Sequence, residues 1–310
     1  MITIPATNLT VYPLCLGGNV FGWSASKEQS FEILNHFFDH GGNFIDTADV
    51  YSEWADGNTG GESETIIGEW IQARKNRQDI VIGTKVAKLS TRRGLSKSNI
   101  LKACDDSLQR LKTDYIDIYY SHEDDPTVPF EETLSAYDEL IQAGKVRYIA
   151  ASQHSAARLE SALDAAEQSN LPKYIALQDH YNLVHREPFE SEQAKVLVKH
   201  GISMIPFFGL ATGFLTGKYQ PGIAVDSVRA KSVEKYQNPA GWAVLEELMA
   251  VAKELETSVS TAALAWLRHH PQVSAPIASA RTVAQLIEIM PLVTLSDDQI
   301  ARLNSVSSSS

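Results

Sequence analysis

Short apolar runs alternate with amphipathic stretches along the whole chain. The runs are rich in β-branched and aromatic residues, and they lie at 12–17, 43–48, 79–86, 114–122, 146–152, 174–178, 202–208 and 273–279. Most of them are apolar almost throughout instead of alternating with polar residues, which is typical of strands buried on both faces. The pattern therefore predicts eight strands in a parallel sheet.

The stretches between these runs have the apolar spacing of helices. In 28–41 apolar residues recur at i, i+3 and i+7, and a similar stripe runs through 96–111, where Ser96 or Ser98 would be the N-cap. Strands that alternate with helices from one end to the other indicate an α/β protein whose sheet is covered by helices.

Eight such units, with no linker or change of composition between them, fit a (β/α)₈ TIM barrel formed by residues 1–310 as a single domain. A short strand or hairpin would precede the barrel at its N-terminus. An open doubly wound sheet is the alternative, but Gly17, Gly18 and Gly22 lack the spacing of a dinucleotide-binding glycine fingerprint.

Two parts of the chain depart from the regular alternation. The stretch 219–241 reads as a long loop between the seventh strand and the next helix, and loops of this length in compact domains are usually functional or mobile. Additional helices are predicted near the C-terminus, within 242–256, 259–270 and 296–306.

Composition narrows the classes of partner. The 310 residues include 44% hydrophobic and 21% charged residues, and the net charge is −11, without a basic stripe. Nucleic acid is therefore not an expected partner. No apolar run reaches the roughly 20 residues of a membrane span, the first residues lack the pattern of a secretory signal, and there are only two cysteines. We expect a cytoplasmic protein without membrane contact and without a metal site, whose oligomeric state stays open.

Polar side chains gather where three successive strands are predicted to end. Asp46, Asp49 and Tyr51 follow the second strand, Lys85 lies near the end of the third and His122 at the end of the fourth. Active sites of (β/α)₈ barrels lie at this end of the strands. Taken singly, each residue has a structural explanation, such as a turn aspartate or a surface lysine. Their placement at consecutive strand ends favours a shared site.

These residue types can protonate an oxygen that acquires negative charge. A free tyrosine titrates near pH ~10, and a neighbouring ammonium group would lower that pKa. We therefore expect Lys85 to make the phenol of Tyr51 more acidic, Asp46 to hold Lys85 charged, and His122 to orient a bound carbonyl.

Six stretches resemble the motifs of the aldo-keto reductase superfamily, and the resemblance covers about residues 9 to 304. They are GGNFIDTADVYS, GESETIIGEW, IVIGTKV, RLKTDYIDIYYSH, GKVRYIAAS and GFLTGKY. The resemblance implies a (β/α)₈ barrel, a nicotinamide cofactor held without a Rossmann domain, and a catalytic tetrad of Asp46, Tyr51, Lys85 and His122 with Tyr51 as the proton donor.

The resemblance also implies a set of cofactor contacts. They are Gly18, Asn19, Asp46, Ser152, Gln153, Gln178, Phe207, Phe208, Gly209, Leu210, Ala211, Gly213, Lys218, Arg229, Ser279, Arg281 and Gln285. Phe207 would be the ring stacked on the nicotinamide. Gln153, Phe208 with Gly209, and Ile289 depart from the residues usual in the family, and Ile289 replaces an asparagine that binds adenine.

The predicted activity is the reversible, NADPH-dependent reduction of an aldehyde or ketone. Arg281 near a helix start favours NADPH over NADH, because it could bind a phosphate on the ribose. Trp23, Tyr51, Trp54 and His122 are the expected substrate contacts, and which carbonyl compound they accept stays open. The alternatives are a non-catalytic nicotinamide-binding subunit, like the potassium-channel beta subunits of this fold, and a barrel lyase or hydrolase that uses Lys85 as a nucleophile.

Overall fold

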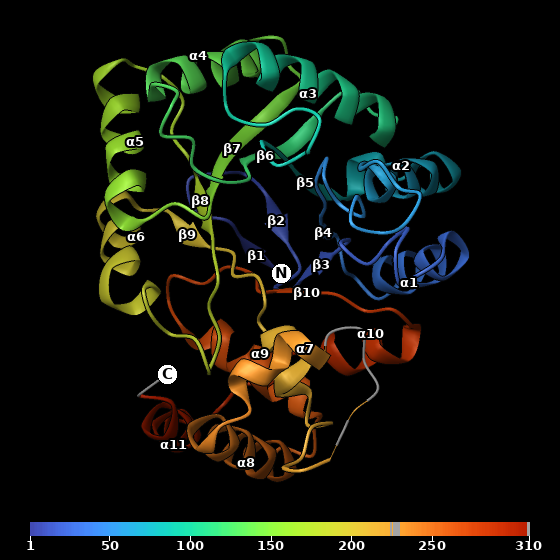
Figure 1. The fold of residues 1–310 in the computed structure, drawn as a ribbon, viewed down its shortest axis with the longest axis vertical. Helices are drawn as coiled ribbons and strands as arrows, with labels where there is room; N and C mark the ends of the chain where they lie inside the picture. The colour runs from blue at the N-terminus through green and yellow to red at the C-terminus, as the bar shows by residue number, and fades with distance from the viewer. Residues whose placement is uncertain (224, 226–229, 309–310) are drawn as a thin grey trace.

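A curled parallel sheet lies at the centre of the computed structural model, which describes residues 1–223, 225 and 230–308 (Figure 1). Its eight strands are paired in the order β10-β3-β4-β5-β6-β7-β8-β9, and every pair is parallel. They are β3 (Cys15–Gly17), β4 (Phe44–Asp46), β5 (Val81–Val86), β6 (Ile116–Ser121), β7 (Val146–Ser152), β8 (Ala176–Gln178), β9 (Ser203–Met204) and β10 (Ile277–Ala278). Each predicted apolar run contains one of these strands.

Hydrogen bonds also join the two edges of this sheet. Met204 of β9 forms a parallel bridge with Val273. The Met204 amide donates to the carbonyl of Gln272 at 2.7 Å, and the Ile277 amide of β10 donates to the carbonyl of Pro206 at 2.8 Å. Backbone pairing therefore continues from β9 to the segment that leads into β10, as the predicted barrel requires.

Helices surround the sheet and follow its strands in turn (Figure 1). They are α1 (Lys27–Asp39), α2 (Glu62–Arg74), α3 (Lys97–Leu111), α4 (Phe130–Gln142), α5 (Ala156–Gln168), α6 (Ala194–His200) and α10 (Val283–Ile289), with a short 3₁₀ turn η1 (Arg77–Asp79) and a π-helical turn η2 (Phe189–Gln193). Ser96 is the N-cap of α3, since its side chain accepts a hydrogen bond from the Asn99 amide. Gly68 of α2 packs so closely on α3 that a Cβ there would overlap the carbonyl oxygen of Arg110.

The apolar core has two parts, one on each side of the sheet. The larger part fills the space between the strands and the surrounding helices. The smaller part lies inside the curled sheet, where side chains such as Phe44 and Ile118 meet Ile4, Leu9 and Val11. The last three belong to the segment of an N-terminal antiparallel hairpin, β1 (Ile2–Thr3) paired with β2 (Thr10–Val11), as the sequence predicts.

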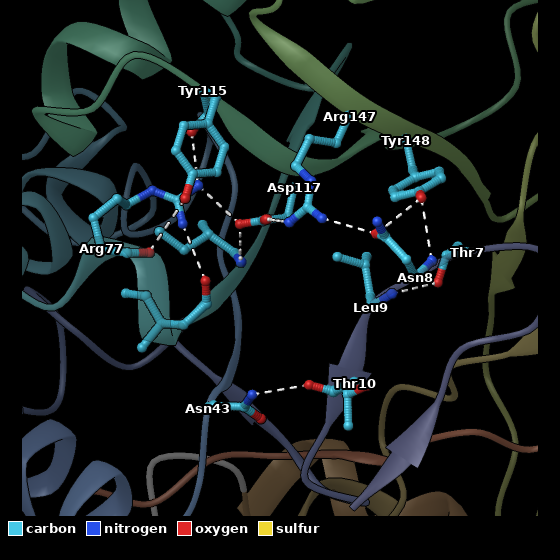
Figure 2. A network of polar contacts seen from close by, with 12 residues as sticks. Thr7, Asn8, Leu9, Thr10, Asn43, Arg77, Tyr115, Asp117, Arg147 and Tyr148 are labelled. Carbon is cyan, nitrogen blue, oxygen red and sulfur yellow. Dashed lines mark hydrogen bonds and ion pairs between the residues drawn. The ribbon is translucent and has the colours of Figure 1, made fainter.

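A polar network connects this hairpin to the beginnings of the central strands (Figure 2). The buried carboxylate of Asp117, in β6, accepts from Arg77 at 2.8 Å and from Arg147 at 2.6 Å. Arg147 also donates to the side chain of Asn8 at 2.8 Å, and the Asn43 side chain donates to the carbonyl of Thr10 at 3.0 Å. The hairpin therefore lies across the strand-start end of the sheet, opposite the end at which the predicted site residues lie.

The C-terminal third carries additional helices, and here one prediction is wrong. The stretch 219–241, predicted as a loop, contains α7 (Ala230–Val233), the 3₁₀ turn η4 (Glu234–Tyr236) and the start of α8 (Pro239–Glu254). These turns are too short to produce an apolar repeat, so the sequence pattern does not reveal them. The helices α8, α9 (Val259–His269) and α11 (Asp297–Ser307) agree with the prediction, and η3 (Ala211–Thr216) precedes the loop.

None of the helices in the described parts of the chain combines the length and the apolar character that crossing a bilayer would require.

Candidate active site

The structure brings together the side chains predicted from three strand ends. Asp46 is the last residue of β4, Lys85 lies one residue before the end of β5, and His122 directly follows β6. The parallel register pairs Asp46 with Gly83 and Lys85 with Tyr120. Asp46 and Lys85 therefore lie close together at the C-terminal ends of neighbouring strands. Tyr51 reaches the same place from the loop after β4.

Lys85 lies at the centre of this group and is completely buried. Its Nζ donates to the Asp46 carboxylate at 2.7 Å, to the carbonyl of Thr47 at 2.7 Å and to the Tyr51 hydroxyl at 2.9 Å. An ammonium group has three donors, and all three are used. The position of Nζ is therefore fixed, and the charge of Lys85 is balanced by Asp46.

Asp46 connects the lysine to two further side chains. The Tyr51 hydroxyl donates to its carboxylate at 3.0 Å, and Nε2 of Gln178, in β8, donates at 2.9 Å. With 2% of its surface exposed, this carboxylate is stabilised by hydrogen bonds and an ion pair and not by water.

The pKa of Tyr51 differs in direction from the prediction. Burial is the largest effect and the Asp46 carboxylate the next, and together they raise the pKa of the phenol well above its usual value. The prediction that Lys85 lowers this pKa overall is therefore wrong for the site as it stands, because burial and the Asp46 carboxylate outweigh the ammonium group. Tyr51 consequently keeps its proton at neutral pH.

His122 lies beside Tyr51 as a neutral imidazole. The two rings meet edge to face with centroids 5.9 Å apart. Burial, followed by the charges of Lys85 and Lys88, lowers the pKa of His122 well below its usual value. Among the described residues, Nδ1 of this ring has no hydrogen-bond partner. A neutral imidazole can donate one hydrogen bond to a ligand oxygen.

Asp49 does not take part in this group, although it stands between Asp46 and Tyr51 in the sequence. Its side chain is fully buried near Glu64, Arg110 and Arg92. Burial and the charge of Glu64 raise its pKa to about 7, and the two arginines and the Val50 amide offset this only in part. Asp49 therefore belongs to a buried charge cluster behind the site.

A cavity of about 750 Å³ opens above the four predicted catalytic side chains. Three of the four line it, namely Asp46, Tyr51 and His122, whereas Lys85 lies beneath them. The predicted cofactor contacts that line it are Asn19, Asp46, Ser152, Gln153, Gln178, Phe207, Phe208, Gly209, Leu210, Gly213, Lys218, Ser279, Arg281 and Gln285. Residues far apart in the sequence thus share one cavity.

Three predicted contacts among the described residues are not found there. Gly18 lies behind the wall, where its amide donates to the carbonyl of Asp46 at 2.7 Å. Ala211 is fully buried, and Trp23 packs edge-on against Trp54, with ring centroids 5.7 Å apart, instead of lining the cavity. Arg229 lies outside the described residues.

Several residues that line the cavity were not predicted from the sequence. They are Val20, Ser24, Lys88, Thr212, Thr216, Gly217, Ser260, Ile277, Ala278 and Glu288. Ile289, predicted at the adenine position as a departure from the family, lines the cavity as well. Thr216 and Gly217 lie inside the run GFLTGKY that carries the family resemblance, and Thr212 directly precedes it, so their position was an available signal. Lys88 follows Lys85 by three residues, whereas Ser260 comes from α9 and only the tertiary structure brings it here.

The residues present fit a nicotinamide dinucleotide. The hydroxyl of Ser152 is buried against the cavity and has no hydrogen-bond partner among the described residues, so a donor and acceptor is free for an amide group. Phe207 offers a flat ring, and Lys218 and Arg281 offer cations along the same cavity. An elongated anionic ligand with one flat, uncharged end matches this distribution.

Comparisons with known proteins identify one family. The profile of the Aldo/keto reductase family matches residues 13–308. The chain is 33% identical to an uncharacterized oxidoreductase, YrpG, of Bacillus subtilis, over 96% of this chain and 92% of that protein. It is 32% identical to a probable voltage-gated potassium channel subunit beta of Arabidopsis thaliana, over 93% and 91% of the two chains.

A third relative carries an activity in its name. Norsolorinic acid reductase B of Aspergillus parasiticus is 36% identical over 67% of this chain and 57% of its own length. A family match that spans most of the chain, together with relatives aligned over nearly their whole length, establishes that this protein belongs to the aldo/keto reductase family.

Proposed function

We propose that this protein reduces an aldehyde or ketone to the alcohol with NADPH, in a reversible reaction. The observation that carries this proposal is the hydrogen-bonded group of Asp46, Lys85 and Tyr51 at the base of a cavity of about 750 Å³. Tyr51 and His122 line this cavity side by side, so that one carbonyl oxygen could accept a hydrogen bond from each once the Tyr51 hydroxyl turns from Asp46 to the ligand.

The cofactor would occupy the length of the cavity. Ser152, Gln153, Gln178 and Phe207 would hold the nicotinamide end, and Lys218 would bind the pyrophosphate. Ser279, Arg281 and Gln285 would hold the adenosine end, where the guanidinium of Arg281 favours the additional phosphate of NADPH over NADH. When bound, the nicotinamide supplies the hydride that adds to the carbonyl carbon.

Tyr51 would supply the proton to the carbonyl oxygen. Its raised pKa keeps the phenol protonated until that oxygen gains negative charge. Once the proton leaves, the phenolate oxygen lies 2.9 Å from the Lys85 ammonium, which stabilises the new charge. The neutral imidazole of His122 would direct the carbonyl by donating a hydrogen bond to the same oxygen.

The surroundings of Lys85 argue against a lyase or hydrolase that forms a Schiff base. Such a lysine needs a neutral amine with access to the substrate. Burial lowers the pKa of Lys85, and the Asp46 carboxylate offsets this only in part. However, Nζ is completely buried and makes three hydrogen bonds, so a substrate has no access to it. A nucleophilic role would require this whole arrangement to be broken.

A nicotinamide-binding subunit without turnover is the second candidate. The observation that favours it is the similarity to a protein named as a probable voltage-gated potassium channel subunit beta. The two candidates share the cofactor and differ in the chemistry, so the rate of NADPH oxidation separates them.

The test is to mix the protein with NADPH and a panel of aromatic aldehydes, diketones and sugars, and to follow the absorbance of NADPH. We expect turnover with at least one carbonyl, a loss of about 10²- to 10⁴-fold in kcat for Tyr51→Phe, and unchanged NADPH affinity. Tyr148→Phe is the matched control, because this tyrosine bonds to Asn8 beneath the opposite end of the sheet. NADPH binding without any turnover would favour the regulatory subunit, and full activity of Tyr51→Phe would disprove the assigned proton donor.

A further inference from the structure

Three flat rings are stacked at the wall of the cavity near Phe207. His180 lies nearly parallel to Phe207, with an interplanar angle of 17° and ring centroids 5.8 Å apart. His185 lies nearly parallel to His180 at 3.8 Å, again with an angle of 17°. Phe207 lines the cavity, whereas neither histidine is among the residues that do. The two histidines therefore pack against the Phe207 ring without lining the cavity themselves.

The backbone holds this stack in register. His180 and Phe207 form a parallel bridge, and the Phe207 amide donates to the carbonyl of Asp179 at 3.0 Å. Asn182 and His185 exchange backbone hydrogen bonds in both directions at 3.0 Å, which folds the chain back and brings His185 onto His180. The order of the three rings is thus built into the segment after β8.

Side-chain hydrogen bonds fix the orientation of the middle ring. Nε2 of His180 lies 3.1 Å from the side-chain amide of Asn182 and 3.3 Å from the hydroxyl of Tyr236. The same Asn182 amide donates to the carbonyl of Phe208 at 2.8 Å, and Phe208 has a left-handed φ of 54° that is unfavourable for a non-glycine residue. The hydrogen bond from Asn182 therefore stabilises the backbone conformation at Phe207 and Phe208.

His180 stays uncharged across the physiological pH range. Burial, followed by the nearby charges of His185 and Lys235, lowers its pKa to about 3. Nε2 is therefore free to accept the hydrogen bonds of Asn182 and Tyr236, and the ring stays uncharged against Phe207.

We propose that His180 is a positioning residue for the nicotinamide half of the cofactor, because it holds the plane and the place of the Phe207 ring. The inference rests on the proposed NADPH site. A flat ring that is fixed before the ligand arrives loses no further conformational freedom on binding, which strengthens stacking. Tyr236 extends the same support to the segment before α8, since its hydroxyl reaches the ring from η4.

The experiment compares two ligands that share the adenosine end. Binding of NADPH and of 2′,5′-ADP, which has no nicotinamide, is measured by calorimetry for the wild type and for His180→Ala. We expect the Kd of NADPH to rise about three- to tenfold, the range that corresponds to the loss of one aromatic pair, and the Kd of 2′,5′-ADP to stay unchanged. His180→Phe, which keeps a flat ring but loses both contacts of Nε2, should weaken NADPH binding less than His180→Ala and at least as much as Tyr236→Phe, for which we expect about threefold.

Controls separate this role from a general effect on folding. His269 is exposed at the end of α9, and His269→Ala should bind both ligands as the wild type does. Equal weakening of both ligands by His180→Ala would overturn the inference, because it would indicate a general structural role. Unchanged binding of both ligands would overturn it as well. A wild type that binds 2′,5′-ADP but gains nothing from the nicotinamide would instead contradict the proposed function.

Discussion

The buried carboxyl group of Asp49 offers a direct test of the electrostatics behind the site. Its pKa is raised from 3.8 to about 7, chiefly by burial and next by the charge of Glu64. In the unfolded chain the group ionises near its ordinary pKa, so the folded state binds more protons between pH 4 and pH 7. The contribution of Asp49 to the free energy of unfolding is therefore fully present at low pH and is lost as the pH rises through 7.

The magnitude follows from the size of the shift. About three pKa units at ~1.4 kcal/mol per unit correspond to about 4 kcal/mol lost by pH 8, and about 3 kcal/mol of this is lost between pH 5 and pH 8. Asp49→Asn removes the titration while keeping the size of the side chain. We expect the free energy of unfolding of this variant, relative to the wild type, to increase by about 3 kcal/mol from pH 5 to pH 8.

The assay is urea unfolding of both proteins at pH 5, 6, 7 and 8. Asp56 is an exposed acid of the same loop region, so Asp56→Asn should show no comparable dependence on pH. If the difference in free energy of unfolding between the wild type and Asp49→Asn stayed constant from pH 5 to pH 8, the reasoning would be refuted. That result would show that Asp49 has the same charge in the folded and the unfolded state throughout this range.

Three further predictions concern single contacts. Lys85→Met should lower kcat by at least about 10²-fold without weakening NADPH binding, because the phenolate of Tyr51 would lose the cation that stabilises it. Steady-state kinetics and calorimetry measure the two effects, and an unchanged kcat would contradict the prediction. Asp117→Asn should reduce the free energy of unfolding by about 3 kcal/mol, because Arg77 and Arg147 would lose their shared carboxylate. Urea unfolding measures this loss, and a value smaller than the experimental error would contradict the prediction. Gly68→Val should destabilise the fold by about 2 kcal/mol or more, because the new side chain would overlap the backbone of α3. Ala73→Val, at an exposed position of the same helix, should cost less. Thermal unfolding compares the two variants, and equal effects would contradict the packing argument.

The eight strands were predictable because most of their residues are buried on both faces of the sheet and are therefore largely apolar; Arg147 of β7 is an exposed exception. Their lengths were less predictable. The runs 202–208 and 273–279 contain only the short strands β9 and β10, because the backbone pairing that defines a strand is brief there. Apolar character records burial, and burial extends beyond the residues that pair.

The grouping of Asp46, Tyr51, Lys85 and His122 followed from their places at the ends of parallel strands, and the structure brings them together. The direction of the Tyr51 pKa did not follow, since it depends on how deeply the phenol is buried and on the proximity of a carboxylate. The stack of His185, His180 and Phe207 was also invisible, because it requires the chain to fold back after β8 and no periodic pattern marks that turn.

The complete burial of Lys85 has a practical consequence for amine chemistry. Reagents that acylate or reductively methylate lysines need a neutral amine that is open to solvent, and the Nζ of Lys85 is enclosed and shared among three acceptors. Lys85 should remain unmodified while surface lysines such as Lys102 react. Labelling of Lys85, detected by mass spectrometry, would then report when the strand-end region of the sheet opens.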